Sequence, residues 1–320
     1  MKEECFIEIP AFSRRTTRTA ELPALPVALE HRLHHPFSCF SSEATPGVPF
    51  ATSLKPLEDL LAPHLRSGGQ RIRARLAWHA AHSLGLDART GMALACCCEW
   101  LHNAALIHDD IQDGDTVRRG APALWTVVGI GPAICAGDAL IAAAHGVLRE
   151  VRVAPARQPA LLEAVQEAVN QTIAGQLDDL AARRTAITRL VEYEAVAARK
   201  SGPLLGLPLA LALIAGGSAA DNRAMAAMAS AAMARLGVAY QLLDDLDDWT
   251  LDQRHDDRHL MNAVLIEMRR RPPDEAKAWV ARRARELLRD AERQAATLPS
   301  GIQPLALWLA GRIGSRLDAG

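Results

Sequence analysis

The stretch TGMALACCCEWLHNAALIHDD, residues 90–110, decides the fold of this chain of 320 residues. Its apolar side chains recur at helical spacing instead of alternating, and the apolar run ends in a pair of aspartates. Residues 219–249 repeat this pattern, because there too an apolar run leads into aspartates. Both segments are longer than ordinary strands, so we predict two long helices with acids at their C-terminal ends.

Composition and spacing outside these segments also predict an all-α protein. Hydrophobic residues make up 49% of the chain but aromatic residues only 4%, and the helix formers alanine and leucine supply most of the apolar content. We expect a single-domain helical bundle with a central active-site cavity over residues 51–320, after an irregular or partly disordered N-terminal arm over residues 1–50. Apolar spacing places further helices at 71–85, 133–150, 160–182, 187–215, 273–296 and 301–316.

Charge and cysteine content exclude several classes of protein. The net charge of −1 gives no basic field for nucleic acid, so we expect no nucleic-acid partner. We expect no integral membrane segment, since no uninterrupted apolar run reaches the length that a bilayer requires. Cys96, Cys97 and Cys98 are adjacent in an apolar segment, which favours buried reduced thiols and a cytoplasmic location.

The two acidic clusters carry the candidate chemistry. Asp109 and Asp113 are four residues apart, as are Asp244 and Asp248, so each pair shares one helix face. Like charges at this spacing destabilise a helix, and negative charge at a helix C-terminus also opposes the helix dipole. One such cluster could be a solvated helix end, whereas two matching clusters on apolar helices indicate sites for divalent cations.

Magnesium fits these clusters better than zinc does. Mg²⁺ prefers a few carboxylates completed by water and substrate phosphate, and the clusters contain no cysteine or histidine that would suit zinc. Arg118 and Arg119 follow the first cluster closely, and arginine forks match phosphate oxygens. The combination predicts a site for a Mg²⁺-bound diphosphate.

Two motifs carry a resemblance to a known family. LIHDDIQDGDTVRRG, residues 106–120, resembles the first aspartate-rich motif of the trans-isoprenyl diphosphate synthases, the polyprenyl synthetase family, and YQLLDDLDD, residues 240–248, resembles the second. The resemblance runs from about residue 55 to 265 and implies the isoprenoid synthase fold, with most likeness to geranylgeranyl diphosphate synthases. Other segments match in the same order: 68–73, 136–140, Gly175-Gln176 with Asp179, and 200–202.

The resemblance also implies residue roles. Three Mg²⁺ ions would be held by the aspartates of both motifs, namely Asp109, Asp110, Asp113, Asp244, Asp245 and Asp248. The catalytic group would comprise Asp109, Asp110, Asp113, Asp244 and Lys200. Allylic diphosphate would contact Arg118, Lys200 and Gln241, and isopentenyl diphosphate would contact Gln70, Arg71, Arg73, His102 and Arg119.

Two departures from the family pattern affect diphosphate binding. Gln70 stands where the family has a lysine after paired glycines, so one cation of the isopentenyl diphosphate site is missing unless Arg71 compensates. The lysines that usually follow the second motif are also absent from residues 249–262. We expect weaker diphosphate binding at the position of Gln70.

The resemblance implies a Mg²⁺-dependent prenyltransferase that condenses an allylic diphosphate with isopentenyl diphosphate. A class I terpene cyclase and a catalytically silent partner subunit are the alternatives. The family also implies a homodimer, for which we expect the helix 90–110 to lie near the interface. Ala105 and Ala104, four and five residues before the first aspartate, are small and imply a product of C20 or longer, with Trp100 as a candidate floor of the cavity.

Overall fold

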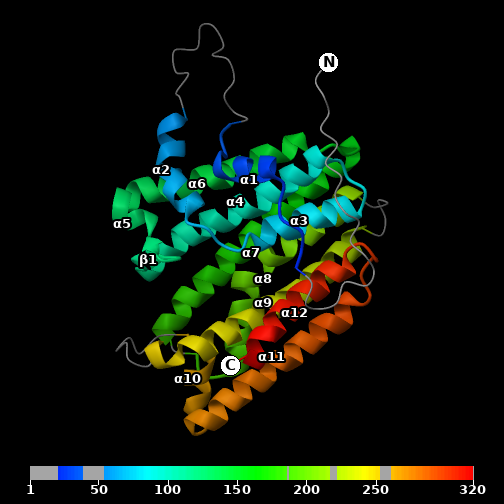
Figure 1. The fold of residues 1–320 in the computed structure, drawn as a ribbon. Helices are drawn as coiled ribbons and strands as arrows, with labels where there is room; N and C mark the ends of the chain where they lie inside the picture. Colours follow the sequence, from blue (N-terminus) through cyan, green and yellow to red (C-terminus); the bar gives the residue numbers. More distant parts are fainter. Residues whose placement is uncertain (1–20, 39–53, 186, 217–221, 253–260, 320) are drawn as a thin grey trace, which may run out of the picture.

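The computed structural model describes residues 21–38, 54–185, 187–216, 222–252 and 261–319 and confirms the all-α class (Figure 1). A hairpin of β1 (Val117–Arg118) and β2 (Ala121–Pro122) is the sheet structure in these ranges, and η1 (Leu148–Glu150) and η2 (Pro155–Arg157) are short 3₁₀ turns. The α-helices in the described residues are α1 (Val27–His34), α2 (Lys55–Arg66), α3 (Ile72–Ser83), α4 (Ala88–Asp113), α5 (Leu124–Val128), α6 (Ile130–Val147), α7 (Gln158–Thr185), α8 (Leu190–Gly216), α9 (Asn222–Asp252), α10 (Ala263–Met268), α11 (Pro273–Ala295) and α12 (Gln303–Ala319).

Helix α4 forms the centre of the bundle and has well-defined ends. The Asp87 carboxylate accepts a hydrogen bond from the Thr90 amide at 2.7 Å, which caps the N-terminus. Gly114, with φ of 72°, ends the helix in the left-handed conformation directly after the first aspartate cluster. Helices α3, α6 and α8 pack around α4, and its run Cys96–Cys98 is buried, as the sequence predicted.

Glycines allow the helices beneath the site to pack closely. A Cβ at Gly175 of α7 would lie 2.3 Å from the backbone nitrogen of Lys200 in α8. A Cβ at Gly206 of α8 would lie 2.9 Å from the Cα of Ser230 in α9. These contacts leave no room for a side chain, so the glycines fix the separation of α7, α8 and α9 and thereby the position of Lys200.

The expected N-terminal arm contains a helix, α1. Residues 1–20 and 39–53 lie outside the described residues, but α1 falls within the expected arm and packs on α4. Leu29 and Leu33 are fully buried, and the Trp100 indole Nε1 donates to the Leu33 carbonyl at 3.1 Å. Prolines and histidines around α1 concealed its apolar face, which is only two turns long.

Among the described residues, one helical segment is both long and apolar enough to be a candidate membrane span. The segment Ile130–Glu150 is long and apolar enough by length and composition, a test that core helices of folded proteins also pass. Asp138 interrupts the apolar run of this segment in the sequence. Part of its surface is exposed, including Ile130 and Ile134.

Candidate active site

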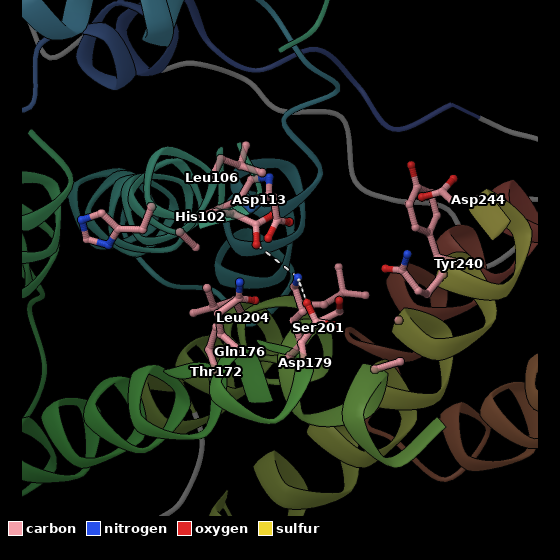
Figure 2. A pocket seen from close by; sticks show the side chains of 18 of the residues that line it. His102, Leu106, Asp113, Thr172, Gln176, Asp179, Ser201, Leu204, Tyr240 and Asp244 are labelled. Atoms are coloured by element: carbon pink, nitrogen blue, oxygen red, sulfur yellow. Dashed lines mark hydrogen bonds and ion pairs between the residues drawn. The ribbon is translucent and has the colours of Figure 1, made fainter. Parts of the chain in front are cut away.

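Both aspartate clusters line one cavity of 1240 Å³ among α3, α4, α7, α8, α9 and α12. Asp113 at the end of α4 and Asp244 on α9 lie on different walls of this cavity, with Asp179 of α7 below them (Figure 2). The structure thus brings together the two motifs, which are more than a hundred residues apart in the sequence.

Lys200 joins the first cluster to α7. Its ammonium lies 3.1 Å from Asp109 Oδ1 and 2.8 Å from Asp179 Oδ2. Burial alone would lower the pKa of Lys200, but the carboxylates of Asp109 and Asp179 outweigh it and raise the pKa. Lys200 therefore keeps its positive charge inside the cavity, next to the expected diphosphate.

Asp110 has a different environment from Asp109 and Asp113. It is buried, and its Oδ1 accepts a hydrogen bond from Arg118 Nε at 2.7 Å. Burial raises the pKa of the Asp110 carboxyl, against the opposing effect of Arg118. Asp109 and Asp113 line the cavity whereas Asp110 does not, so the position of Asp110 favours orientation of Arg118 over direct metal contact.

In the second cluster, Asp244, Asp245 and Asp248 all line the cavity, and Asp245 also anchors the chain that follows. Asp245 is buried, and its Oδ2 accepts from the Ala263 amide at 2.7 Å. Burial raises the pKa of the Asp244 carboxyl to about 6, although Arg316 lowers it. Arg316 Nη2 lies 2.9 Å from Asp244 Oδ1 and 2.6 Å from Asp247 Oδ2.

A group of basic side chains also lines the cavity. This group comprises Arg73, His102 and Arg119. Arg119 has a positive φ of 55° in the hairpin turn, and its guanidinium lies so close to Gly69 that a Cβ there would be 2.7 Å from it. Burial lowers the pKa of His102 well below its usual range, and Arg73 and Arg119 lower it further, so His102 is a neutral hydrogen-bond donor or acceptor.

Arg71 does not supply the positive charge that is missing at Gln70. Arg71 is buried, and its guanidinium donates to Glu99 Oε1 at 3.3 Å and to the Leu65 carbonyl at 2.5 Å. Its Nη2 also lies 3.1 Å from His34 Nε2. Arg71 is thus held by protein groups, so it is badly placed to supply the charge that Gln70 lacks.

The residues of α4 that we expected to limit product length lie on two different faces of the helix. Ala105 lines the cavity, as does Gln241 of α9, whereas Ala104 is buried in the core. The Trp100 ring is fully buried and hydrogen-bonded toward α1, so it is not the floor of the cavity. Apolar residues from three helices continue the wall beyond Ala105: Leu106, Ile173, Leu177, Leu180, Leu204 and Leu205.

The carboxylates fit Mg²⁺ that is completed by a substrate. Among the described residues, no three histidine, cysteine, aspartate or glutamate side chains converge as an all-protein metal cage requires. The first cluster instead presents Asp109 and Asp113 to a shared cavity, and the second presents Asp244, Asp245 and Asp248. Mg²⁺ typically takes one or two carboxylates with water and phosphate, so this donor set suits it.

Comparison with known proteins agrees with this geometry. The family model for polyprenyl synthetase matches residues 55–262. The farnesyl diphosphate synthase of Geobacillus stearothermophilus is 35% identical over 200 residues, which cover 60% of this chain and 66% of that protein. The geranylgeranyl diphosphate synthase of Mycobacterium tuberculosis is 35% identical over 181 residues, which cover 56% of this chain and 50% of that protein.

Solved structures share the fold at lower identity. The geranylgeranyl pyrophosphate synthetase of Geoglobus acetivorans superposes with a TM-score of 0.74 at 21% identity, over 91% of this chain and 97% of that one. A decaprenyl diphosphate synthase from Rhodobacter capsulatus gives a TM-score of 0.71 at 20% identity, over 91% and 95% of the two chains. These likenesses extend the shared fold beyond the motif region to the C-terminal helices.

Proposed function

We propose a specific reaction for this chain, which belongs to the polyprenyl synthetase family. It condenses an allylic diphosphate with isopentenyl diphosphate to give a trans-polyprenyl diphosphate. The observation that carries this proposal is the cavity with Asp109 and Asp113 on one wall, Asp244 and Asp248 on another, and Lys200 beside them. The aligned relatives are named as enzymes of this class, although the matched regions span only 66% and 50% of the two described above.

The first step is loss of diphosphate from the allylic substrate. Asp109, Asp113 and Asp244 would hold Mg²⁺, which when bound neutralises charge on the departing diphosphate. Lys200 and Arg118 add cationic hydrogen-bond donors to the same oxygens. Because Lys200 already lies 3.1 Å from Asp109, it needs little rearrangement to reach a diphosphate bound there.

The second step forms the carbon–carbon bond. Arg73, Arg119 and His102 would hold the diphosphate of isopentenyl diphosphate on the other wall of the cavity. The double bond of that substrate then attacks the allylic carbon, and loss of a proton completes the product. The apolar wall below Ala105 excludes water from the carbocation and receives the growing chain.

The class I terpene cyclase and the silent subunit remain the alternatives, and one experiment separates them. A cyclase would consume an allylic diphosphate alone and release hydrocarbon with inorganic diphosphate, whereas a silent subunit would leave it unchanged. We expect the purified chain with Mg²⁺ to leave the allylic diphosphate intact until isopentenyl diphosphate is added, and then to release inorganic diphosphate and a longer prenyl diphosphate, but no hydrocarbon. Hydrocarbon release without isopentenyl diphosphate would replace our proposal with the cyclase reading.

We propose that the product is C20 or longer. Ala105 leaves the wall nearest the first cluster open, and Trp100 points away toward α1. Because Trp100 does not close the cavity, products longer than C20 fit this wall as readily as geranylgeranyl diphosphate does.

We propose that the chain acts in the cytoplasm. Cys97 and Cys98 are buried free thiols, and Cys135 is an exposed free thiol. Cysteines in this state are typical of a reducing compartment.

We also propose a homodimer, but with an interface away from α4. Helix α4 is covered within the chain by α3, α6 and α8, so the earlier expectation of an interface at residues 90–110 does not follow. Exposed apolar side chains instead lie on one side of α5 and α6, where Val127, Ile130 and Ile134 are 67%, 52% and 42% exposed. Such a row of apolar side chains is typical of a protein interface.

Sedimentation velocity tests this assembly. We expect the wild type to sediment as a dimer at micromolar concentration and Ile134→Asp to shift it toward monomer, because the carboxylate would be buried at the interface. Val191 on α8 is 57% exposed, so Val191→Asp is the matched control and should leave the mass unchanged. A wild-type monomer, or equal effects of both variants, would rule out this interface.

A further inference from the structure

Helix α12 presents one face to the cavity. Leu309 and Ile313 line the cavity, and Arg312 and Arg316 share their side of the helix at i+3 and i+7 from Leu309. Arg316 reaches the second aspartate cluster, as described above. Arg312 lies one turn before Arg316, and its Nη2 donates to Oε1 of the cavity-lining Gln70 at 3.1 Å.

We propose that Arg312 is a binding residue for the diphosphate of the homoallylic substrate, where it supplies the cation that Gln70 lacks. This inference rests on the proposed function. Gln70 lines the cavity, and its amide oxygen is turned to the Arg312 guanidinium, so the guanidinium lies at the edge of the same wall as Arg73 and Arg119. A fixed guanidinium also suits phosphate oxygens better than a neutral amide does.

The neighbours of Arg312 hold its guanidinium near the cavity without using all of its donors. The ring of Trp308 lies 5.4 Å from the Arg312 guanidinium carbon, with the Arg75 guanidinium 5.3 Å from the same ring. Arg312 Nη1 also donates to Glu21 Oε1 at 2.6 Å. A guanidinium has more N–H donors than Glu21 and Gln70 occupy, and the Glu21 side chain is 66% exposed, so its pairing is weakened by water.

Arg312 therefore differs from Arg71 in what it can offer a ligand. The guanidinium of Arg71 is buried against Glu99 and the Leu65 carbonyl, so its release would leave Glu99 as a buried unpaired charge. Arg312 can turn from an exposed carboxylate to a diphosphate, whose greater negative charge competes well with Glu21. Arg312, and not Arg71, thus supplies the positive charge that is missing at Gln70.

Steady-state kinetics with saturating allylic diphosphate test this role. We expect Arg312→Gln to raise the KM for isopentenyl diphosphate about tenfold, with kcat and the KM for the allylic substrate within about twofold. Gln70→Lys should restore the KM in the Arg312→Gln background, yet lower it by less than about twofold in the wild type, because Arg312 already supplies the charge. Arg285→Gln is the matched control, since Arg285 contacts Leu317 and Asp318 of α12, which do not line the cavity, whereas Arg312 contacts Gln70, which does.

The outcomes separate this inference from the proposed function. If the wild type incorporates isopentenyl diphosphate but Arg312→Gln leaves its KM unchanged, the role of Arg312 is wrong and the function stands. Equal rises in the KM of both substrates, or no rescue by Gln70→Lys, would reduce Arg312 to a structural residue. Absence of any incorporation by the wild type would overturn the proposed function itself.

Discussion

Asp109→Ala and Asp244→Ala should each lower kcat about a thousandfold, because each removes a carboxylate that would hold Mg²⁺ against the departing diphosphate. The folded state should survive both changes. Each substitution removes like-charge repulsion at i, i+4 spacing, and alanine is the best helix former. The measurements are turnover of isopentenyl diphosphate and thermal unfolding followed by circular dichroism.

Asp274→Ala provides the control for this loss. Asp274 lies in the first turn of α11, and its side chain is 94% exposed. We expect its turnover to match the wild type. Normal turnover in Asp109→Ala or Asp244→Ala would show that the clusters are solvated helix ends and would remove the basis for the metal site.

Ala105→Phe should shorten the product to C15 or less, because the ring would enter the cavity directly below the first aspartate cluster. Ala104→Phe should instead leave the length unchanged and destabilise the fold by about 1–3 kcal/mol, since Ala104 is buried in the core. Trp100→Ala should likewise keep the product length while costing about 3–5 kcal/mol of stability. Chromatography of dephosphorylated products and thermal unfolding measure the two effects.

These neighbouring substitutions form a matched set on one helix. A shorter product from Ala104→Phe, or a longer one from Trp100→Ala, would show that the chain grows along a different face of α4. Release of only C10 or C15 diphosphates by the wild type would contradict the proposed open wall at Ala105.

Local patterns explain why most of the helices could be predicted. Apolar spacing over residues 90–110 and 219–249 predicted α4 and α9, since periodicity is most informative in long helices. The same logic could have separated Ala105 from Ala104, because Ala105 is four residues before Asp109 and shares its face. Short helices such as α1 and α10 carry too few turns to show a reliable period.

The remaining features depend on contacts between distant residues. Nothing near Arg316 or Arg312 in the sequence shows that these side chains reach Asp244 and Gln70, which are 72 and 242 positions away. Asp110 also looks equivalent to Asp109 in the motif, and only the folded hairpin brings Arg118 onto it. Side-chain partners of this kind are set by tertiary packing, so they could not be predicted from helical periodicity.

Incorporation of labelled isopentenyl diphosphate is the most direct test of the central claim. The purified chain would be incubated with it and with dimethylallyl, geranyl or farnesyl diphosphate, in Mg²⁺ or in EDTA. Our account predicts label in a trans-prenyl diphosphate of C20 or longer when Mg²⁺ is present, and no labelled product in EDTA. Equal product formation in EDTA, or no labelled product from any starter in Mg²⁺, would contradict it.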